Sequence, residues 1–405
     1  MSEYRNSNAG RRKFMQNGVA LGSAAALAGL VSSAALAQGK GTIKLGIMLP
    51  FTGTFAQVGV AVINGFKLAL QQSGGKLGGR DFEYITLDDE SDPSKGADNA
   101  NRLVSRDKVD VLIGTVHSGV QMGMIKIARE SGVLHIIPNA GVHAATEQLC
   151  APNIFRTSFA NGQPAYPMGK VAIDKGIKNV VTLAWKYGAG EESVAGFKDN
   201  FTKSGGKIIK DLWLPFPNVE FQALLTEIAA LKPDGVFVFF AGGGAAKFIR
   251  DWAAAGLKGK ITLMAAGFLT DGTLEAAGNA AEGIETTLHY GDGIDTPTNK
   301  SFRLAYAKAY KLQPDVFSVQ GYDAGLLLAA GMKAAKGDIA RKKEIIAAME
   351  KAEIDSPRGK WRMSAAHNPI QDIYLRRVVG QENKVIGVAQ RALDYPPAAM
   401  CKMQR

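Results

Sequence analysis

The sequence predicts an α/β protein made of two similar lobes with mainly parallel sheets. From residue 42 to about residue 290, short β-rich runs alternate with stretches of helical period. Glycine and proline mark the joins between them, as at Gly74-Gly75, Gly205-Gly206 and Lys232-Pro233. This alternation is typical of parallel sheets. A chain of 405 residues that is 46% hydrophobic is also longer than one core usually serves, which favours two domains.

The first round of strands and helices ends near residue 158. We expect strands at 43–49, 82–87, 109–114 and 134–137, and helices at 60–72, 95–108 and 119–131. Each strand is short and rich in β-branched or apolar residues, and each helix has apolar residues at helical spacing. The segment 156–163 then has strand character followed by a polar connector, so we expect the chain to pass to the second lobe there.

A second round follows with the same rhythm and ends around 283–290. The expected strands are 180–184, 235–240 and 261–265, and the expected helices are 163–175, 191–204, 220–231 and 245–255. Helices at 300–311 and 317–336 and strands over 360–389 come next. We therefore expect one lobe from residues 40–158 plus 289–365, a second from 162–286 plus 370–395, and a C-terminal tail at 396–405.

The first 37 residues have the pattern of an export signal. Arg11-Arg12-Lys13 precedes a charge-free run from Asn17 to Leu36, which ends in Ala35-Leu36-Ala37. The paired arginines are typical of twin-arginine export, and an ordinary Sec signal or an uncleaved anchor stays open. Each alternative places the remaining chain outside the cytoplasm, and we expect a periplasmic protein cleaved near Ala37.

Composition restricts the possible partners. The net charge of +11 is spread without a dense basic run or aromatic platform, so we expect no nucleic-acid partner. No later apolar run is long enough to span a membrane. In an oxidising compartment the two cysteines, Cys150 and Cys401, predict one disulfide, with two unrelated thiols as the alternative.

The sequence does not favour an enzyme. Its five histidines lack metal-ligand spacing, and its cysteines are not paired as Cys-x-x-Cys. The glycine-rich run 242–247 lacks the Gly-Lys-Ser/Thr ending of a phosphate-binding loop, and no Gly-x-Ser-x-Gly elbow is present. We therefore expect no cofactor, no metal and no catalytic residues, with a periplasmic hydrolase as a remote alternative.

The chain resembles the type I periplasmic solute-binding proteins of the leucine/isoleucine/valine-binding kind, which serve ABC importers. The landmarks extend over essentially the whole chain after the signal: Lys44-Leu45-Gly46-Ile47, Thr52-Gly53, Gly114-Thr115-Val116-His117-Ser118, Ile154-Phe155-Arg156-Thr157, Tyr187-Gly188 and Gly321-Tyr322-Asp323-Ala324. The resemblance implies two lobes joined by three crossover strands, a ligand held in the cleft between them, and an ABC permease and ATPase complex as partner. We expect a monomer.

The resemblance also implies the site residues. Ser118 and His117 would hold a ligand carboxylate at a helix start, and Asn139, Ala140 and Gly141 would complete that pocket. Helix capping and ordinary turn roles are the alternatives. The further candidates are the aromatic residues Tyr187, Phe55, Phe268 and Phe317, the histidine His289, and Asn161 at the first hinge. For the aromatic residues and His289 the alternative is core packing.

Departures from the family pattern indicate the ligand class. Amino-acid binders have an acidic residue after the strand 261–265 that pairs with the ligand ammonium, whereas this chain has Phe268 there and Asn161 in place of a hinge aspartate. A buried ammonium without a partner is costly. We therefore hypothesise a small carboxylate ligand, an aromatic acid of the benzoate or hydroxycinnamate type. A branched-chain amino acid or amide ligand and a periplasmic sensor role are the alternatives.

Overall fold

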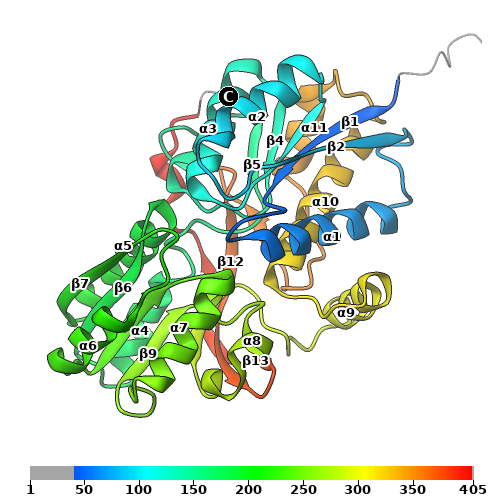
Figure 1. The fold of residues 1–405 in the computed structure, drawn as a ribbon. Helices are drawn as coiled ribbons and strands as arrows, with labels where there is room; N and C mark the ends of the chain where they lie inside the picture. The colour runs from blue at the N-terminus through cyan, green and yellow to red at the C-terminus, as the bar shows by residue number, and fades with distance from the viewer. Residues whose placement is uncertain (1–40, 404–405) are drawn as a thin grey trace, which may run out of the picture. The chain divides into compact units, whose positions relative to one another are not determined.

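The first sheet has five parallel strands in the order β2-β1-β3-β4-β5 (Figure 1). They belong to a computed structural model that describes residues 41–403, so the predicted signal at 1–37 lies outside the described residues. The strands are β1 (Ile43–Leu49), β2 (Phe82–Asp88), β3 (Val111–Gly114), β4 (Leu134–Ile137) and β5 (Ile154–Arg156). The helical segments that follow or pack on this sheet are α1 (Ala56–Gln72), α2 (Lys95–Asn101), η1 (Arg102–Arg106), α3 (Ser118–Ser131), η2 (His143–Thr146), α9 (Pro297–Tyr310), α10 (Val316–Ala334) and α11 (Lys342–Glu350).

Both faces of this sheet are buried, as a parallel sheet requires. Alternate residues of β1 point to opposite faces: Leu45 and Ile47 join the main core with α1 and α10, whereas Met48 joins a second core with α2 and α3. Helices α1 and α10 pack against each other in Figure 1, and α2 packs on α3. The near-continuous apolar composition of β1 follows from this two-sided burial.

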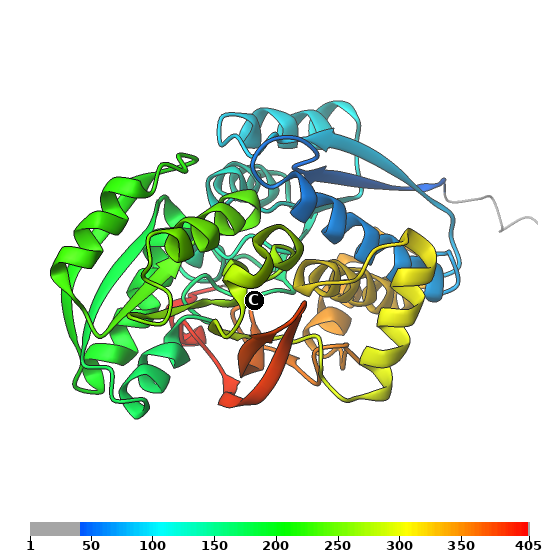
Figure 2. The same ribbon diagram turned by 60° about the horizontal axis from the view of Figure 1, so that its bottom comes forward.

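The second sheet has eight strands and is mixed. Its order is β11-β12-β10-β9-β8-β6-β7, with β13 paired to β12. The strands are β6 (Asn179–Lys186), β7 (Lys207–Pro215), β8 (Gly235–Phe239), β9 (Thr262–Ala266), β10 (Glu285–Leu288), β11 (Arg362–Met363), β12 (Pro369–Val379) and β13 (Glu382–Leu393). Strands β6 to β10 pair in parallel, whereas β12 is antiparallel to β10, β11 and β13. The hairpin of β12 and β13 is drawn in orange-red in Figure 2.

The helical segments of the second sheet are α4 (Tyr166–Asp174), α5 (Gly188–Lys203), α6 (Gln222–Leu231), α7 (Gly242–Ala254), η3 (Gly267–Leu269), α8 (Leu274–Ala277) and η4 (Gly278–Ala281); η5 (Ala398–Met400) follows β13. The structure starts α4 at Tyr166, three residues after the predicted start. Pro167 lies in its first turn, where a missing backbone N–H costs nothing. The expected helix over 95–108 is present as α2 followed by the π-helical turn η1.

The two sheets repeat one strand order. Read in chain order, β2-β1-β3-β4-β5 corresponds to β7-β6-β8-β9-β10. In each sheet the order reverses between the first and third strands, and loops from the carboxyl ends of such strands diverge to leave a crevice. The predicted α/β class with two similar parallel sheets is confirmed, and the repeated order indicates where a ligand site is to be expected.

The chain passes between the sheets three times: after β5, after β10, and between α11 and β12. The first crossing, residues 157–165, contains no strand. Two of its backbone carbonyl groups accept hydrogen bonds from Arg358 of the third crossing, which donates to Thr157 O at 2.6 Å and to Ser158 O at 3.1 Å. Arg358 also pairs with Asp323 of α10 at 3.0 Å, and both side chains are almost fully buried. The hydrogen bonds of Arg358 therefore attach the first crossing to the third, and its buried ion pair attaches the third crossing to α10.

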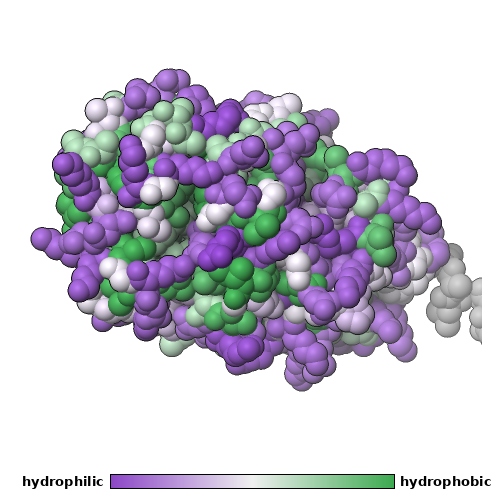
Figure 3. All heavy atoms as spheres, turned by 90° about the horizontal axis from the view of Figure 1, so that it is seen from below, coloured by the Kyte–Doolittle hydropathy of each residue, from purple (hydrophilic) through white to green (hydrophobic). Residues whose placement is uncertain are grey.

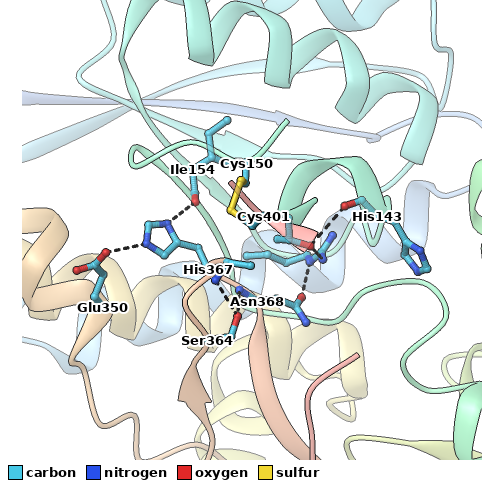
Figure 4. Close-up of a disulfide and its surroundings, with 11 residues drawn as sticks. His143, Cys150, Ile154, Glu350, Ser364, His367, Asn368 and Cys401 are labelled. Atoms are coloured by element: carbon cyan, nitrogen blue, oxygen red, sulfur yellow. Dashed lines mark hydrogen bonds and ion pairs between the residues drawn. A yellow bond between two sulfur atoms is a disulfide. The ribbon is translucent and has the colours of Figure 1, made fainter. Parts of the chain in front are cut away.

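A disulfide joins the region before β5 to the C-terminal segment (Figure 4). It connects Cys150 to Cys401 across a sequence separation of 251 residues. Beside it, the His367 ring contacts Ile154 O at 2.9 Å through Nδ1 and Glu350 Oε1 at 3.0 Å through Nε2. The disulfide and the hydrogen bonds of His367 thus hold segments that are far apart in the sequence close to β5.

The face in Figure 3 is mostly hydrophilic, with hydrophobic side chains in patches between the polar ones. Within residues 41–403, no helix combines the length and the apolar character that a membrane crossing needs.

Replacing Arg358 by methionine should destabilise the fold by about 3–5 kcal/mol, because Asp323 would stay buried without its partner. Urea denaturation measures the change. Arg341→Met is the matched control: it breaks the exposed pair with Glu344 and should cost less than about 1 kcal/mol. Equal losses in the two variants would contradict a special role for the Arg358–Asp323 pair.

Candidate functional site

A cavity lies where loops from the carboxyl ends of both sheets meet. Its volume is about 30 Å³. The contributing loops follow β1, β3 and β4 of the first sheet and β6, β8 and β9 of the second, and the first crossing and α10 complete the wall. The lining residues are Phe55, Val58, Val116, Asn139, Gly141, Phe159, Asn161, Tyr187, Ala189, Phe239, Ala241, Phe268 and Phe317. The position agrees with the crevice that the strand order predicts.

Six of the thirteen residues that line the cavity are aromatic. Phe268 is at its centre: its ring centroid lies 4.5 Å from that of Phe159, 6.0 Å from Phe239 and 6.2 Å from Phe317. The 3-10 turn η3, directly after β9, presents Phe268. A capping box between Asp315 and Ser318 fixes the start of α10 and thereby places Phe317. The wall is an apolar surface suited to a flat ring.

Asn139 is one of two amide side chains in the wall, and a hydrogen-bonded chain holds it. Its Nδ2 donates to Gln320 Oε1 at 2.6 Å, and Gln320 Nε2 lies 3.1 Å from His289 Nε2. Burial lowers the pKa of His289 well below its usual value, so the ring is neutral and accepts from Gln320. His289 therefore supports Asn139 through Gln320 and does not itself line the cavity.

Asn161 is the second amide and belongs to the first crossing. Its Nδ2 donates to Ser118 Oγ at 3.1 Å and to Glu192 Oε2 at 2.7 Å. The residue expected at the hinge thus also lines the cavity. Ser118 is buried behind it and reaches the cavity only through this amide. Ala140 likewise lies outside the lining, where its N–H donates to Thr115 O at 3.0 Å.

His117 acts as the cap of α3. Its Nδ1 accepts the Gly119 N–H at 3.0 Å, which is the capping role considered for Ser118. Its ring stacks on Tyr187 at 4.8 Å between centroids and lies outside the lining. Burial lowers the pKa of His117 to about 4, so the ring carries no charge near neutral pH.

Tyr187 offers a hydrogen-bond donor in the wall. It lies between β6 and α5, and burial raises the pKa of its hydroxyl, which therefore keeps its proton. Phe55, just before α1, also lines the cavity, and both rings lie beside the ring of Phe216. Together with the two amides, this hydroxyl supplies the polar groups of a site that is otherwise apolar.

The residues that line the cavity carry no charged side chain. A cationic group would thus meet no counter-charge there, whereas amide and hydroxyl donors suit a carboxylate. In the part of the chain that the structure describes, no group of three or more His, Cys, Asp or Glu side chains is placed to hold a metal ion. The arrangement is chemically that of a binding site for an uncharged or anionic aromatic molecule.

The sequence interpretation missed several lining residues. Phe159 lies in the crossing, and Val58, Val116, Ala189, Phe239 and Ala241 come from loops or strand ends. Phe239 is the last residue of β8 and Ala241 lies two residues after it, so the rule that sites form at the carboxyl ends of strands identifies them. Nothing local distinguishes Phe159 from an ordinary loop aromatic, since the crossing geometry alone turns it toward Phe268.

The known proteins to which this chain is similar are solute-binding proteins. The sequence profile described as "Periplasmic binding protein" matches residues 42–383. Leu/Ile/Val-binding protein homolog 6 of Brucella abortus (strain 2308) is 31% identical over 364 residues, which cover 88% of this chain and 91% of the relative.

Two solved structures are similar over nearly the whole of their own chains. A solute-binding protein of an ABC transporter from R. palustris, in complex with benzoate, is 52% identical with a TM-score of 0.87, and the match covers 89% of this chain and 100% of that one. A second one, from Rhodopseudomonas palustris BisB5 in complex with 3,4-dihydroxybenzoic acid, is 31% identical with a TM-score of 0.83, covering 88% and 99%.

Gly141 leaves no room for a side chain. A Cβ there would lie 2.3 Å from Asn161 Oδ1, 2.7 Å from the Phe159 ring and 2.8 Å from the Asn161 backbone nitrogen. We expect Gly141→Ala to lower the free energy of unfolding by about 1–3 kcal/mol, because the crossing must shift. Chemical denaturation tests this against Gly243→Ala, where a Cβ meets nothing within 4 Å. A Gly141→Ala protein as stable as the control would contradict the packing described.

Proposed function

The chain belongs to the periplasmic binding protein family, and on that premise we propose that it captures an aromatic carboxylate in the cavity and delivers it to an ABC transporter. The ligand class is the benzoate or hydroxycinnamate type. The protein would work as a monomer in the periplasm, with a permease and ATPase complex as its partner. It would bind its ligand without transforming it, and it would need no cofactor.

Phe268 carries the proposal. It occupies the position where the resemblance places an acidic partner for an ammonium group, and it lies at the centre of an aromatic wall without charged side chains. A ligand ring would replace water against Phe159, Phe268 and Phe317. The benzoate and dihydroxybenzoate complexes of similar proteins support this choice of ligand.

The carboxylate would be held by dipoles. The Tyr187 hydroxyl and the amides of Asn139 and Asn161 are the polar groups that reach the cavity. Such groups can stabilise an anion without a counter-ion, provided that their own positions are fixed in advance. The hydrogen bond to Gln320 fixes the Asn139 amide, and those to Ser118 and Glu192 hold the Asn161 amide in the ligand-free protein.

A branched-chain amino acid is the second candidate, because the Brucella relative is named for Leu, Ile and Val. Its ammonium group would require an acidic partner, and no carboxylate belongs to the described lining. Glu192 is the nearby acidic side chain that contacts a lining residue, through Asn161. A periplasmic sensor that reports to a membrane receptor would use the same site and differs only in the partner.

We expect benzoate and 4-hydroxybenzoate, but not leucine or valine, to raise the melting temperature of the protein, because a ligand that binds only the folded state stabilises it. Phe268→Ala should weaken benzoate binding about 10- to 100-fold through lost ring contact. Titration calorimetry measures the affinities, and Phe82→Ala, in β2 and outside the cavity lining, is the control. A melting shift with leucine alone would refute the proposed ligand class.

A further inference from the structure

A carboxyl group beside the cavity connects three parts of the chain. Glu192 of α5 accepts the backbone N–H of His143 at 3.1 Å through Oε1 and at 3.0 Å through Oε2. Its Oε2 also accepts Nδ2 of Asn161 at 2.7 Å. His143 begins η2 near the first sheet, and Asn161 belongs to the first crossing. The ligand-binding role proposed above uses this carboxyl group only as a hydrogen-bond partner of Asn161 and leaves its charge unexplained.

The carboxylate determines which way the Asn161 amide faces. Both hydrogens of Nδ2 are used, one toward Glu192 and one toward Ser118. The remaining atom, Oδ1, lies on the side of the lining residue Gly141, where an added Cβ would come within 2.3 Å of it. An amide oxygen only accepts hydrogen bonds. In this orientation Asn161 therefore presents a hydrogen-bond acceptor. A ligand carboxylate is also an acceptor, so the two groups would repel each other.

We propose that Glu192 takes up one proton when a carboxylate ligand binds, and that the Asn161 amide then turns its N–H groups toward the ligand. This inference rests on the proposed function, because it needs an anion in the cavity. Glu192 is thus a positioning residue for Asn161, and the affinity for an anionic ligand depends on the protonation state of its carboxyl group.

Every hydrogen bond has a counterpart after the change. The proton comes from solvent and forms an O–H on Glu192, which donates to the turned Oδ1 of Asn161. The other carboxyl oxygen keeps the His143 N–H. The Ser118 hydroxyl accepts in one orientation and donates in the other, so it fits both.

The surroundings of Glu192 bring the pKa of its carboxyl group close to neutral pH. Burial raises its pKa to about 7, against the lowering effect of the hydrogen bonds from Asn161 and His143 and of the Arg156 charge, while Glu147 raises it further. The His143 ring is neutral because burial, together with the Arg156 charge, lowers its pKa to about 3. Burial raises the pKa of Tyr395, whose hydroxyl keeps its proton. A ligand anion adds a like charge and favours the protonated carboxyl group.

The test is the benzoate affinity of the full chain from about pH 6 to about pH 9. Below the pKa of the free protein Glu192 is already protonated and the affinity should be constant; above it, the affinity should fall about tenfold per pH unit, since each binding event must capture a proton. Calorimetry at about pH 8 in buffers of different ionisation enthalpy should show about one proton taken up per benzoate bound.

Glu192→Gln imitates the protonated carboxyl group and should bind benzoate independently of pH, without proton uptake. The neighbouring, exposed Glu191→Gln is the matched control and should keep the wild-type slope. Proton uptake that persists in Glu192→Gln, or wild-type binding without uptake, would overturn the inference while leaving the proposed function intact. If Glu192→Gln does not fold, the wild-type proton count alone decides. Absence of benzoate binding at every pH would overturn the proposed function, and this inference with it.

Discussion

The buried backbone of the first crossing is the constraint on which the rest of the structure depends. Residues 157–161 leave the first sheet, so no neighbouring strand satisfies their carbonyl groups. An unpaired carbonyl group in such a place is costly. Arg358 and Gln371, both distant in sequence, donate to Thr157 and Ser158. Because these donors hold the crossing, Phe159 and Asn161 are held in the cavity wall.

No charged side chain lines the cavity in the part of the chain that the structure describes, but one charged side chain contacts a residue of its wall from behind. Apolar rings and two amides line the cavity, whereas the carboxyl group of Glu192 lies one residue behind the wall and meets it through hydrogen bonds. The buried imidazole of His289 supports the wall in the same indirect way. The hydrogen-bonded chain from His289 through Gln320 fixes the direction of the Asn139 amide before a ligand arrives. The proposed preference for an aromatic acid over an amino acid rests on what the described lining lacks, since an ammonium group would find no carboxylate in it.

Much of the fold could be predicted because its strands and helices have clear local patterns. The buried β1 is almost uniformly apolar, and the capped α10 begins at a capping box. The pattern does not predict β7, because this edge strand is largely exposed and carries lysines and an aspartate among its apolar residues. For the cavity, the rule of carboxyl strand ends and the family resemblance both pointed to the loops that hold Phe55, Tyr187 and Phe268. The spacing of residues in the sequence does not show that Ser118 and His117 lie behind the cavity wall.

By itself the sequence determined the α/β class, the repeated strand and helix rhythm, and the absence of an acidic residue at Phe268, since these are properties of consecutive residues and their types. Only the tertiary structure decided which side chains face the cavity. Phe159 becomes a wall residue, Ser118 a supporting one, and Glu192 a neighbour of Asn161 because segments far apart in the chain meet there. Hydrogen-bond partners at such a meeting point depend on distances in space, and no local pattern of residues encodes them.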